Sequence, residues 1–307
     1  MILEFDNLTD FNKYIGMPLP RDKDFEVSTL DSYENISLIE EIPPFRHRFF
    51  SICLATQIDM ELSTGYYKRK PKAPFLIFKS PFQTMSWQIQ PGLKKGIHLL
   101  FTENFMLRHQ QLSNIIYEFP FLQIDKAIPL EIGDNDVKSL FDIFLRIEEE
   151  YNEGLPDRFD MIASLVYILL VSIRRVYEQS AVIENELSII AKNNDLALFN
   201  RFKDMLDQKT EYADNATEGG RSVNYYADKL SIHPNYLNAV VKRVIGKNVL
   251  NLIHEHILSH AKTLLLQTNM TIKEISFQLA FNEPTHFGSF FKKYTGQTPI
   301  EFRKQVQ

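Results

Sequence analysis

Two segments of the sequence carry the same arrangement of polar and basic side chains at an offset of fifty residues. They read HPNYLNAVVKRVIGKNV (233–249) and EPTHFGSFFKKYTGQTP (283–299). Hydrogen-bonding side chains stand at the start of each segment, and a pair of cations follows, Lys242-Arg243 in the first and Lys292-Lys293 in the second. Such side chains pair with polar edges and with anions, so the repeat predicts two copies of one binding element.

Each copy has the end signals of a short helix that follows a turn. Pro234 and Pro284 suit a first helical position, where the missing N–H costs no hydrogen bond. Gly246 and Gly296 suit the left-handed residue that ends a helix. Between these ends, an apolar stripe at helical spacing runs along each copy: Leu237, Val240 and Val241 in the first, and Phe287, Phe290 and Phe291 in the second.

A shorter helix is predicted before each copy. The first has an apolar face of Val223, Tyr226, Ala227 and Leu230. The second opens with a capping box, Thr271 to Glu274, and runs through Ile275 and Leu279. A short helix, a tight turn and a second helix are typical of a helix-turn-helix unit. A longer amphipathic helix is predicted to link the two units through Leu250, Ile253, Ile257, Ala261, Leu264 and Leu265.

This segment resembles the DNA-binding domain of the AraC/XylS family of bacterial transcription regulators. Its second unit, TIKEISFQLAFNEPTHFGSFFKKYTGQTPIEFR (271–303), follows the family signature, and the resemblance covers residues 195–304. Two positions depart from it: Ala280 replaces a glycine before the phenylalanine, and His256 replaces an arginine of the linking helix. The resemblance implies an all-α domain, with two helix-turn-helix units joined by a long helix and two recognition helices in successive major grooves of duplex DNA.

Base-edge contacts are expected from the outward, N-terminal positions of the recognition helices. These are Asn235, Tyr236 and Asn238 in the first helix, and Glu283, Thr285, His286 and Ser289 in the second. Phosphate contacts are expected from Lys242, Arg243, Lys292 and Lys293, which lie late in the helices. The alternatives are contact with phosphate or water alone for the first set, and favourable charge at a helix C-terminus for the second.

The N-terminal part is predicted to form a β-sandwich or barrel. Short strands bounded by turns are read at FRHRFFSICLAT (45–56), APFLIFKSP (73–81), TMSWQIQ (84–90) and GIHLLF (96–101). Fragments at 46–54, 80–87 and 95–101 resemble the cupin-like sensing domain found upstream in the same family. That resemblance implies a cupin-like β-barrel with flanking helices over residues 1–180.

A small-molecule effector is the ligand that such a domain implies. Trp87, Arg46 and Arg48 are the candidates for its pocket, because aromatic side chains line pockets and arginines bind acidic ligands. Core packing of Trp87 and a surface position for the arginines are the alternatives. Metal-dependent cupins need a closely spaced histidine pair, whereas His47 stands alone. Neither a metal, a cofactor nor an enzymatic activity is therefore expected.

Helical periodicity follows the strands, over 137–145, 159–176 and about 185–209. The resemblance implies that the helices of residues 134–178 form a homodimer, and the broad apolar stripe of 159–176 agrees with this. The alternative is that these helices cover the open face of the barrel. Residues 181–194 are expected to be a linker, 195–307 the DNA-binding domain, and 210–221 a flexible loop. The expected class is α+β with two domains.

Charge is divided unevenly along the chain. Residues 219–307 contain 11 Lys and Arg and 5 Asp and Glu, a net of +6. Subtraction from the totals of 34 and 39 leaves 23 and 34 for residues 1–218, a net of −11. A basic segment on an acidic body fits a polyanionic partner at one end.

The acidic N-terminus lacks the layout of a secretory signal, and the apolar run 161–173 is too short to cross roughly 30 Å of hydrocarbon. With Cys53 as the single cysteine, a cytoplasmic location is expected.

These features predict a sequence-specific, DNA-binding transcription regulator, an activator by family resemblance, controlled by a small molecule at its N-terminal domain. Its expected partners are duplex DNA, RNA polymerase and a second copy of the chain, with no membrane. One alternative is a constitutive regulator whose N-terminal domain only dimerises or binds a protein; no feature of the sequence excludes it, and a folded N-terminal domain with no solvent-accessible cavity would favour it. The other is a DNA-targeted cupin enzyme, which would need metal ligands or a nucleophile motif.

Overall fold

The computed structural model describes residues 2–30, 40–64, 67–113, 115–124, 126–180, 193–209 and 222–304. The chain divides into two compact units, residues 1–192 and 193–307. The first contains two sheets with helices and the second contains helices, which confirms the predicted α+β class with sheets before helices. No helix in the described ranges is long and apolar enough to cross a lipid bilayer.

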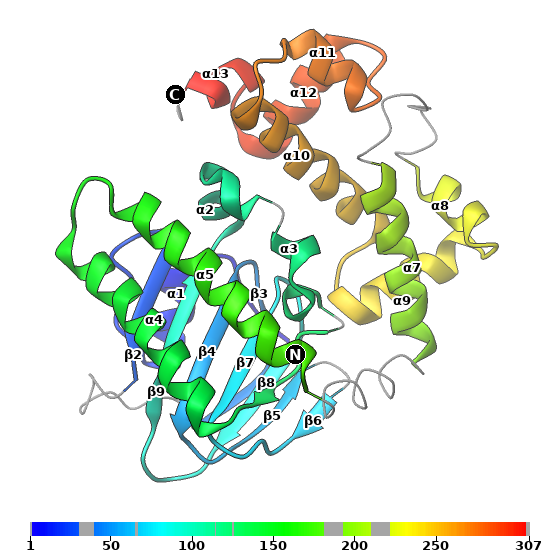
Figure 1. Ribbon diagram of the computed structural model, residues 1–307. Coiled ribbons are helices and arrows are strands. Elements are labelled where there is room, and N and C mark those ends of the chain that lie inside the picture. The colour runs from blue at the N-terminus through cyan, green and yellow to red at the C-terminus, as the bar shows by residue number, and fades with distance from the viewer. Residues whose placement is uncertain are drawn as a thin grey trace. The chain divides into compact units, whose positions relative to one another are not determined.

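Ten described strands of the first unit form two five-stranded sheets (Figure 1). The first sheet contains, in spatial order, β1 (Leu3–Phe5), β3 (Glu41–His47), β8 (Met85–Ile89), β5 (Met60–Thr64) and β6 (Tyr67–Arg69). The second contains β10 (Leu130–Glu131), β7 (Phe75–Lys79), β4 (Phe50–Gln57), β9 (Lys95–Phe101) and β2 (Phe25–Thr29). Neighbouring strands are antiparallel except for β1 and β3.

Alternation along β4 shows how the second sheet serves two cores. Phe50, Ile52 and Leu54 are buried in a cluster with the helices of this unit. The intervening residues face the first sheet, where Ala55 is buried among side chains of both sheets. Because side chains alternate across a strand, each strand of this sheet supplies one residue set to each core.

Helices complete a three-layer arrangement. The long helices α4 (Asp134–Glu153) and α5 (Arg158–Glu178) lie across the outer face of the second sheet (Figure 1). Helix α1 (Leu8–Ile15) adds three apolar side chains to the core between the sheets. Four short helical segments connect β9 to β10: α2 (Glu103–Arg108), η1 (Gln110–Leu112), α3 (Ile115–Glu118) and η2 (Pro120–Leu122).

The predicted barrel is wrong, because the described strands form two separate sheets instead of a closed cylinder. Segment 45–56, which reads as one strand, contains the end of β3 and most of β4, and these two strands belong to different sheets. Alternation shows which face of a strand is buried, but it does not show which strand lies beside it. The second sheet buries both faces, one on helices and one on the other sheet, so burial is achieved without closure.

The apolar stripe of α5 is used mainly within its own unit. Its fully buried residues are Ile162, Ala163, Val166, Leu169, Leu170 and Ile173. They pack on the second sheet. This agrees with the alternative expectation that these helices cover an open face, although the face belongs to a sheet and not to a barrel. Most of the stripe is therefore used within this unit, and Met161 and Ile168, which lie outside the stripe, are the exposed large apolar side chains of α5, each 51% exposed.

The second unit consists of seven described helices. They are α7 (Asn194–Lys209), α8 (Val223–Lys229), α9 (Pro234–Ile245), α10 (Val249–Gln267), α11 (Ile272–Gln278), α12 (Pro284–Thr295) and α13 (Pro299–Lys304). These helices include every one predicted in this part of the sequence. The loop 210–221 and most of the expected linker, residues 181–192, lie outside the described residues, as does the start of the stretch 185–209.

A buried carboxyl group ties the edge of the second sheet to α4. Glu26 on β2 is 4% exposed, and the Tyr151 hydroxyl of α4 donates a 2.9 Å hydrogen bond to its Oε2. The same hydroxyl accepts the backbone N–H groups of Arg21 and Asp22. Burial raises the pKa of Glu26 from 4.5 to about 7, and the Tyr151 hydrogen bond opposes this shift.

This raised pKa predicts a pH-dependent stability of the first unit. The folded state holds the Glu26 proton more tightly than the unfolded state, so the stabilisation is complete below about pH 4.5 and is lost as pH rises through about 7. Glu26→Gln keeps an acceptor for Tyr151 and removes the titration. Between pH 5 and 8, wild type should lose on the order of 1–3 kcal/mol relative to this variant.

Urea unfolding followed by fluorescence of Trp87, the single tryptophan, measures the first unit selectively. Glu149→Gln, on an exposed face of α4, is the matched control and should leave the pH profile unchanged. Parallel profiles for wild type and Glu26→Gln would contradict the assignment.

Candidate nucleic-acid interface

Each helix pair of the second unit is closed by the same backbone hydrogen bonds. In the α8–α9 turn, the Ile232 N–H donates to the Ala227 carbonyl at 3.0 Å. In the α11–α12 turn, the Phe281 N–H donates to the Ser276 carbonyl at 2.9 Å. The second turn is one residue longer, because Asn282 stands between this bond and the start of α12. The fifty-residue offset therefore holds for α9 and α12 but not for the helices before them.

Both turns pass through a left-handed residue that is not glycine. Ser231 has φ 56° and Ala280 has φ 61°. Ala280 is the position where the sequence departs from a family glycine, and its methyl group makes this backbone conformation less favourable. The turn keeps its hydrogen bonds in spite of the alanine, so the departure affects stability more than geometry.

The predicted ends of α9 and α12 agree with the structure. Pro234 and Pro284 open the two helices. Gly246 and Gly296 end them in the left-handed conformation, with φ 79° and 80°, and each N–H donates to the carbonyl of the first lysine of the basic pair. The capping box of Thr271 and Glu274 is also present. These local signals place both polar faces on regular helices.

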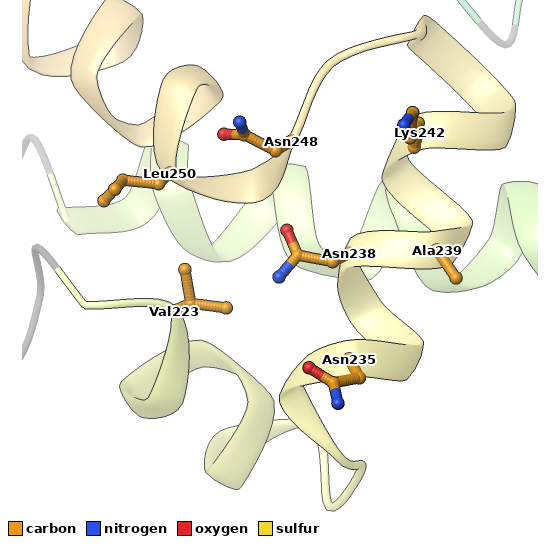
Figure 2. Close-up of a pocket in the computed structure, with 7 residues that line it drawn as sticks. All are labelled: Val223, Asn235, Asn238, Ala239, Lys242, Asn248 and Leu250. Carbon is orange, nitrogen blue, oxygen red and sulfur yellow. The ribbon is translucent and has the colours of Figure 1, made fainter.

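The face of α9 opens onto a hollow of about 550 Å³ (Figure 2). Asn235, Asn238, Ala239 and Lys242 supply it from α9, with Val223 of α8 and with Asn248 and Leu250 at the start of α10. Figure 2 shows Asn235 and Asn238 directed from α9 toward Val223. A concave face with amide and ammonium groups suits the edges and backbone of a polar polymer. Leu250, predicted for the linking core, is 41% exposed here.

The side chain of Asn238, unlike that of Asn235, forms a hydrogen bond with the start of α10. Its Oδ1 accepts a 3.0 Å hydrogen bond from the Val249 N–H, and the side chain is half-buried. A bidentate contact with adenine needs both the oxygen and the nitrogen of an amide, so this hydrogen bond competes with such a contact. Asn235 is exposed in the same hollow, and Asn238 orients the start of α10 beside it.

Lys242 and Arg243 have different surroundings. Lys242 is exposed and lines the hollow. Arg243 turns to α7, where its Nε and Nη2 donate to the two carboxylate oxygens of Asp195 at 2.6 and 2.9 Å. This hydrogen-bonded pairing lowers the pKa of Asp195. Arg243 therefore joins α9 to α7 and is less available for phosphate than its neighbour. Tyr236 is 47% exposed and does not line the hollow.

The second helix pair exposes the expected residues of α12. Glu283, Thr285, His286, Ser289, Lys292 and Lys293 are all exposed. Lys293 lies over the Tyr294 ring at 5.4 Å, whereas Lys292 occupies the position of Lys242 in the repeat. Arg303 anchors this pair by donating to the carbonyls of Leu265 and Met270 at 3.0 and 2.7 Å.

The sequence analysis did not identify Gly288 or Ala239 as candidate interface residues, although Ala239 lines the hollow. Gly288 lies inside α12 at the repeat position of Asn238, and a Cβ added there would meet open space. A glycine inside a helix costs roughly 0.5–1 kcal/mol relative to alanine. No packing contact within the described residues offsets this cost at Gly288. A glycine in the interior of a predicted helix is the signal by which the sequence could have identified it.

The three residues predicted for an effector pocket lie in different surroundings in the first unit. Trp87 packs edge-on against Phe45 at 5.2 Å and lines a cavity between the sheets. Arg46 is 6% exposed and donates from Nε to Thr84 Oγ1 at 2.9 Å. Arg48 forms an exposed ion pair with Asp6 at 2.6 Å. Trp87 alone of the three lines the cavity.

The histidines of α10 contribute to packing in the second unit. His254 Nδ1 lies 2.7 Å from the Tyr294 hydroxyl and so links α10 to α12. Burial lowers the pKa of His256 to about 4 and that of His260 below its usual value. Within the described ranges, no three histidine, cysteine, aspartate or glutamate side chains are placed to hold a metal ion.

The second unit is similar in sequence to known DNA-binding proteins. Residues 226–305 match the family model described as a helix-turn-helix domain. The chain is 34% identical over 80 residues to the uncharacterized transcriptional regulatory protein YesN of Bacillus subtilis (strain 168), covering 25% of this chain and 22% of that protein. It is 29% identical over 91 residues to the arabinose operon regulatory protein of Escherichia coli (strain K12), covering 30% of this chain and 31% of that protein.

One solved structure, that of a transcriptional regulator (AraC-type DNA-binding domain-containing proteins) from Chromobacterium violaceum, is 27% identical. It covers 28% of this chain and 76% of that chain, with a TM-score of 0.26. The match to the family model identifies residues 226–305 of the second unit as a helix-turn-helix DNA-binding domain. Its sequence is similar to the DNA-binding domains of the AraC type. The chain spans only 22% and 31% of the two curated relatives, so the similarity concerns this domain.

The strained turn before α12 yields a stability prediction. Ala280→Gly should stabilise the second unit by about 1 kcal/mol, because glycine adopts a positive φ without a steric penalty. Ala239→Gly, in the interior of α9, is the matched control and should destabilise it by roughly 0.5–1 kcal/mol. Urea unfolding followed by helical circular dichroism measures both changes, and equal signs would show that Ala280 is not strained.

Proposed function

We propose that this protein is a sequence-specific transcription regulator that reads duplex DNA with α9 and α12. The exposed polar face of α9, repeated on α12 at a fifty-residue offset, carries the proposal. A helix of this size fits the major groove, and two copies on one domain suit two successive grooves. The relatives that share the domain are regulators by name, which supports the same role here.

Base reading is assigned to the exposed side chains near the start of each helix. Asn235 is suited to adenine through its amide, and Glu283 to the amino group of cytosine. Tyr236, Thr285, His286 and Ser289 complete this set, whereas Asn238 is assigned mainly to positioning α10. Each good base contact contributes about 1–3 kcal/mol of discrimination.

Selection of random duplex DNA by the purified protein, with sequencing and footprinting, tests this proposal. Two short enriched motifs centred about 10 base pairs apart are expected, because that is one turn of the duplex. Asn235→Ala should relax the first motif and His286→Ala the second. Unenriched DNA, with binding that disappears at moderate salt, would show phosphate contact alone and would overturn the proposal.

The neighbouring cations of α9 provide a matched pair of variants. Lys242→Ala should reduce the slope of log affinity against log salt by about 1, as expected for one lost phosphate contact. Arg243→Ala should leave that slope unchanged and cost up to about 1 kcal/mol of stability through the Asp195 ion pair. Salt titrations of affinity, with parallel unfolding curves, measure both. Equal slopes for the two variants would refute the division of roles.

Gly288 gives a test in which stability and binding move in opposite directions. Gly288→Ala should stabilise α12 by about 0.5–1 kcal/mol. It should weaken DNA binding, because we assign the bare backbone at this position to close approach of the duplex. Ser276→Ala is the control: its buried hydroxyl has no hydrogen-bond partner among the described residues and lies away from the exposed face. Unchanged DNA affinity in Gly288→Ala would remove Gly288 from the interface.

Effector control, transcription activation through RNA polymerase and homodimerisation form the rest of the proposal. A ligand of the first unit would shift the population that is competent to bind DNA or polymerase. The cavity between the sheets supports such a ligand over a purely constitutive regulator. Sedimentation of the full chain tests the dimer, for which Met161 and Ile168 are exposed apolar candidates on α5.

A further inference from the structure

The two sheets of the first unit enclose a cavity of about 100 Å³. Most of its lining is apolar, with Met60, Met85 and Trp87 on the first sheet and Ile77 on the second. On β4, the inward residues Ser51 and Cys53 are small. These small side chains, at the centre of the second sheet, leave space between them and the larger side chains of the facing sheet.

Three basic side chains enter this apolar space from three strands. They are Lys79 on β7, His98 on β9 and His47 on β3 of the facing sheet, with exposures of 2%, 6% and 1%. Lys79 pairs in register with Ser51, and His98 with Cys53, so both flank β4 at successive inward positions. Strand alternation turns them toward the cavity instead of toward the helices.

These basic groups lack the partners that buried polar groups normally have. Among the described residues, Lys79 Nζ, His98 Nε2 and both ring nitrogens of His47 make no satisfactory hydrogen bond. Lys79 Nζ lies 5.2 Å from the Phe45 ring centroid, and the His47 ring stacks on Phe49 at 3.9 Å. His98 Nδ1 is 3.4 Å from Ser28 Oγ, and none of the described residues that line the cavity is acidic.

This arrangement is costly unless a ligand completes it. Burying an unpaired cation costs several kcal/mol, and a folded protein lowers that cost by losing the charge. Burial, with the Arg46 guanidinium nearby, holds the pKa of Lys79 well below its usual range. Burial also lowers the pKa of His98 to about 4, so its imidazole is neutral and can donate one N–H. A bound carboxylate would favour the charged form of Lys79, and one ammonium with neutral imidazoles suits a single negative charge.

We propose that this cavity binds a small monocarboxylate with an apolar body, whose carboxylate pairs with Lys79 Nζ and accepts from the His98 imidazole. His47 is a second donor from the facing sheet, and the apolar body lies among the methionines and Trp87. A benzene molecule occupies an engineered cavity of about 150 Å³, so a space of this size takes about four to six heavy atoms. Short, saturated or branched acids therefore fit.

The inference rests on effector control within the proposed function, but its test does not need DNA. Calorimetric titration of the full chain with propionate, butyrate and isobutyrate should show saturable, one-site binding. Butyramide and 1-butanol, which lack the charge, should bind at least ten-fold more weakly. Succinate and inorganic phosphate, which carry further charge, should not bind. Equal binding of the acid and its amide would overturn the role of the cations.

Lys79→Met removes the cation and keeps the length of the side chain. It should weaken carboxylate binding at least ten-fold and raise the melting temperature of the ligand-free protein, because an unpaired buried amine is lost. Lys95→Met, an exposed lysine on β9, is the matched control and should change neither. Undiminished binding by a folded Lys79→Met protein would refute the site. The site would also be refuted if wild type bound none of the acids and Lys79→Met had a lower melting temperature than wild type.

DNA affinity measured with and without the bound acid separates the two proposals. Carboxylate binding without any change in DNA affinity keeps this inference and removes effector control by this site. Sequence-specific DNA binding by a protein that takes up none of the acids removes this inference and keeps the DNA-reading function.

Discussion

The periodic burial of side chains is the constraint on which both units depend. A helix that buries a stripe at a period of 3.6 residues exposes the opposite positions, and a strand that buries alternate residues directs the others to its second face. In α9, burial of Leu237, Val240 and Val241 leaves Asn235 and Lys242 exposed. In β7, burial of Leu76 and Phe78 against the helices directs Lys79 into the core between the sheets. The same rule therefore generates an outward binding face and an inward one.

The two helix pairs of the DNA-binding domain share their frame but not their surface. Their turn hydrogen bonds, proline starts and glycine ends agree closely. At the repeat position where α9 carries Asn238, which is bonded to the next helix, α12 carries Gly288 and a bare backbone. Where α9 carries Arg243, paired with α7, α12 carries Lys293. The first pair is thus stabilised by contacts with its neighbours, whereas at the same two positions the second carries a bare backbone and an exposed lysine.

The first unit buries three basic side chains, Lys79, His98 and His47, in the core between its two sheets. Apolar packing on both faces of the second sheet provides the stability within which three buried basic groups are tolerated. Such groups cannot be solvated where they lie, and a rearrangement that exposed them would disrupt the packing of two sheets. The cavity between the sheets therefore brings basic side chains together with no acidic partner among the described residues that line it, whereas a surface ion pair such as that of Arg48 with Asp6 is complete.

Local signals in the sequence were sufficient for the helices of the second unit. Pro234, Gly246 and the Thr271–Glu274 capping box act over one turn of helix, so their effect does not depend on distant residues. The fifty-residue repeat and the exposed positions of α9 and α12 followed from the same short-range rules, and so did most strands of the first unit. The family resemblance extended this to the DNA-binding class.

Tertiary structure decided everything that depends on pairing between distant segments. The sheet order, which replaced the barrel, the Asp195–Arg243 ion pair and the Asn238–Val249 hydrogen bond join residues that no local pattern connects. Arg46, predicted for a pocket, was instead satisfied by Thr84, while Lys79 and His98 converged on the cavity without any motif. The physical reason is that alternation determines which side of a strand is buried, whereas only the packing of the two sheets determines which buried side chains meet.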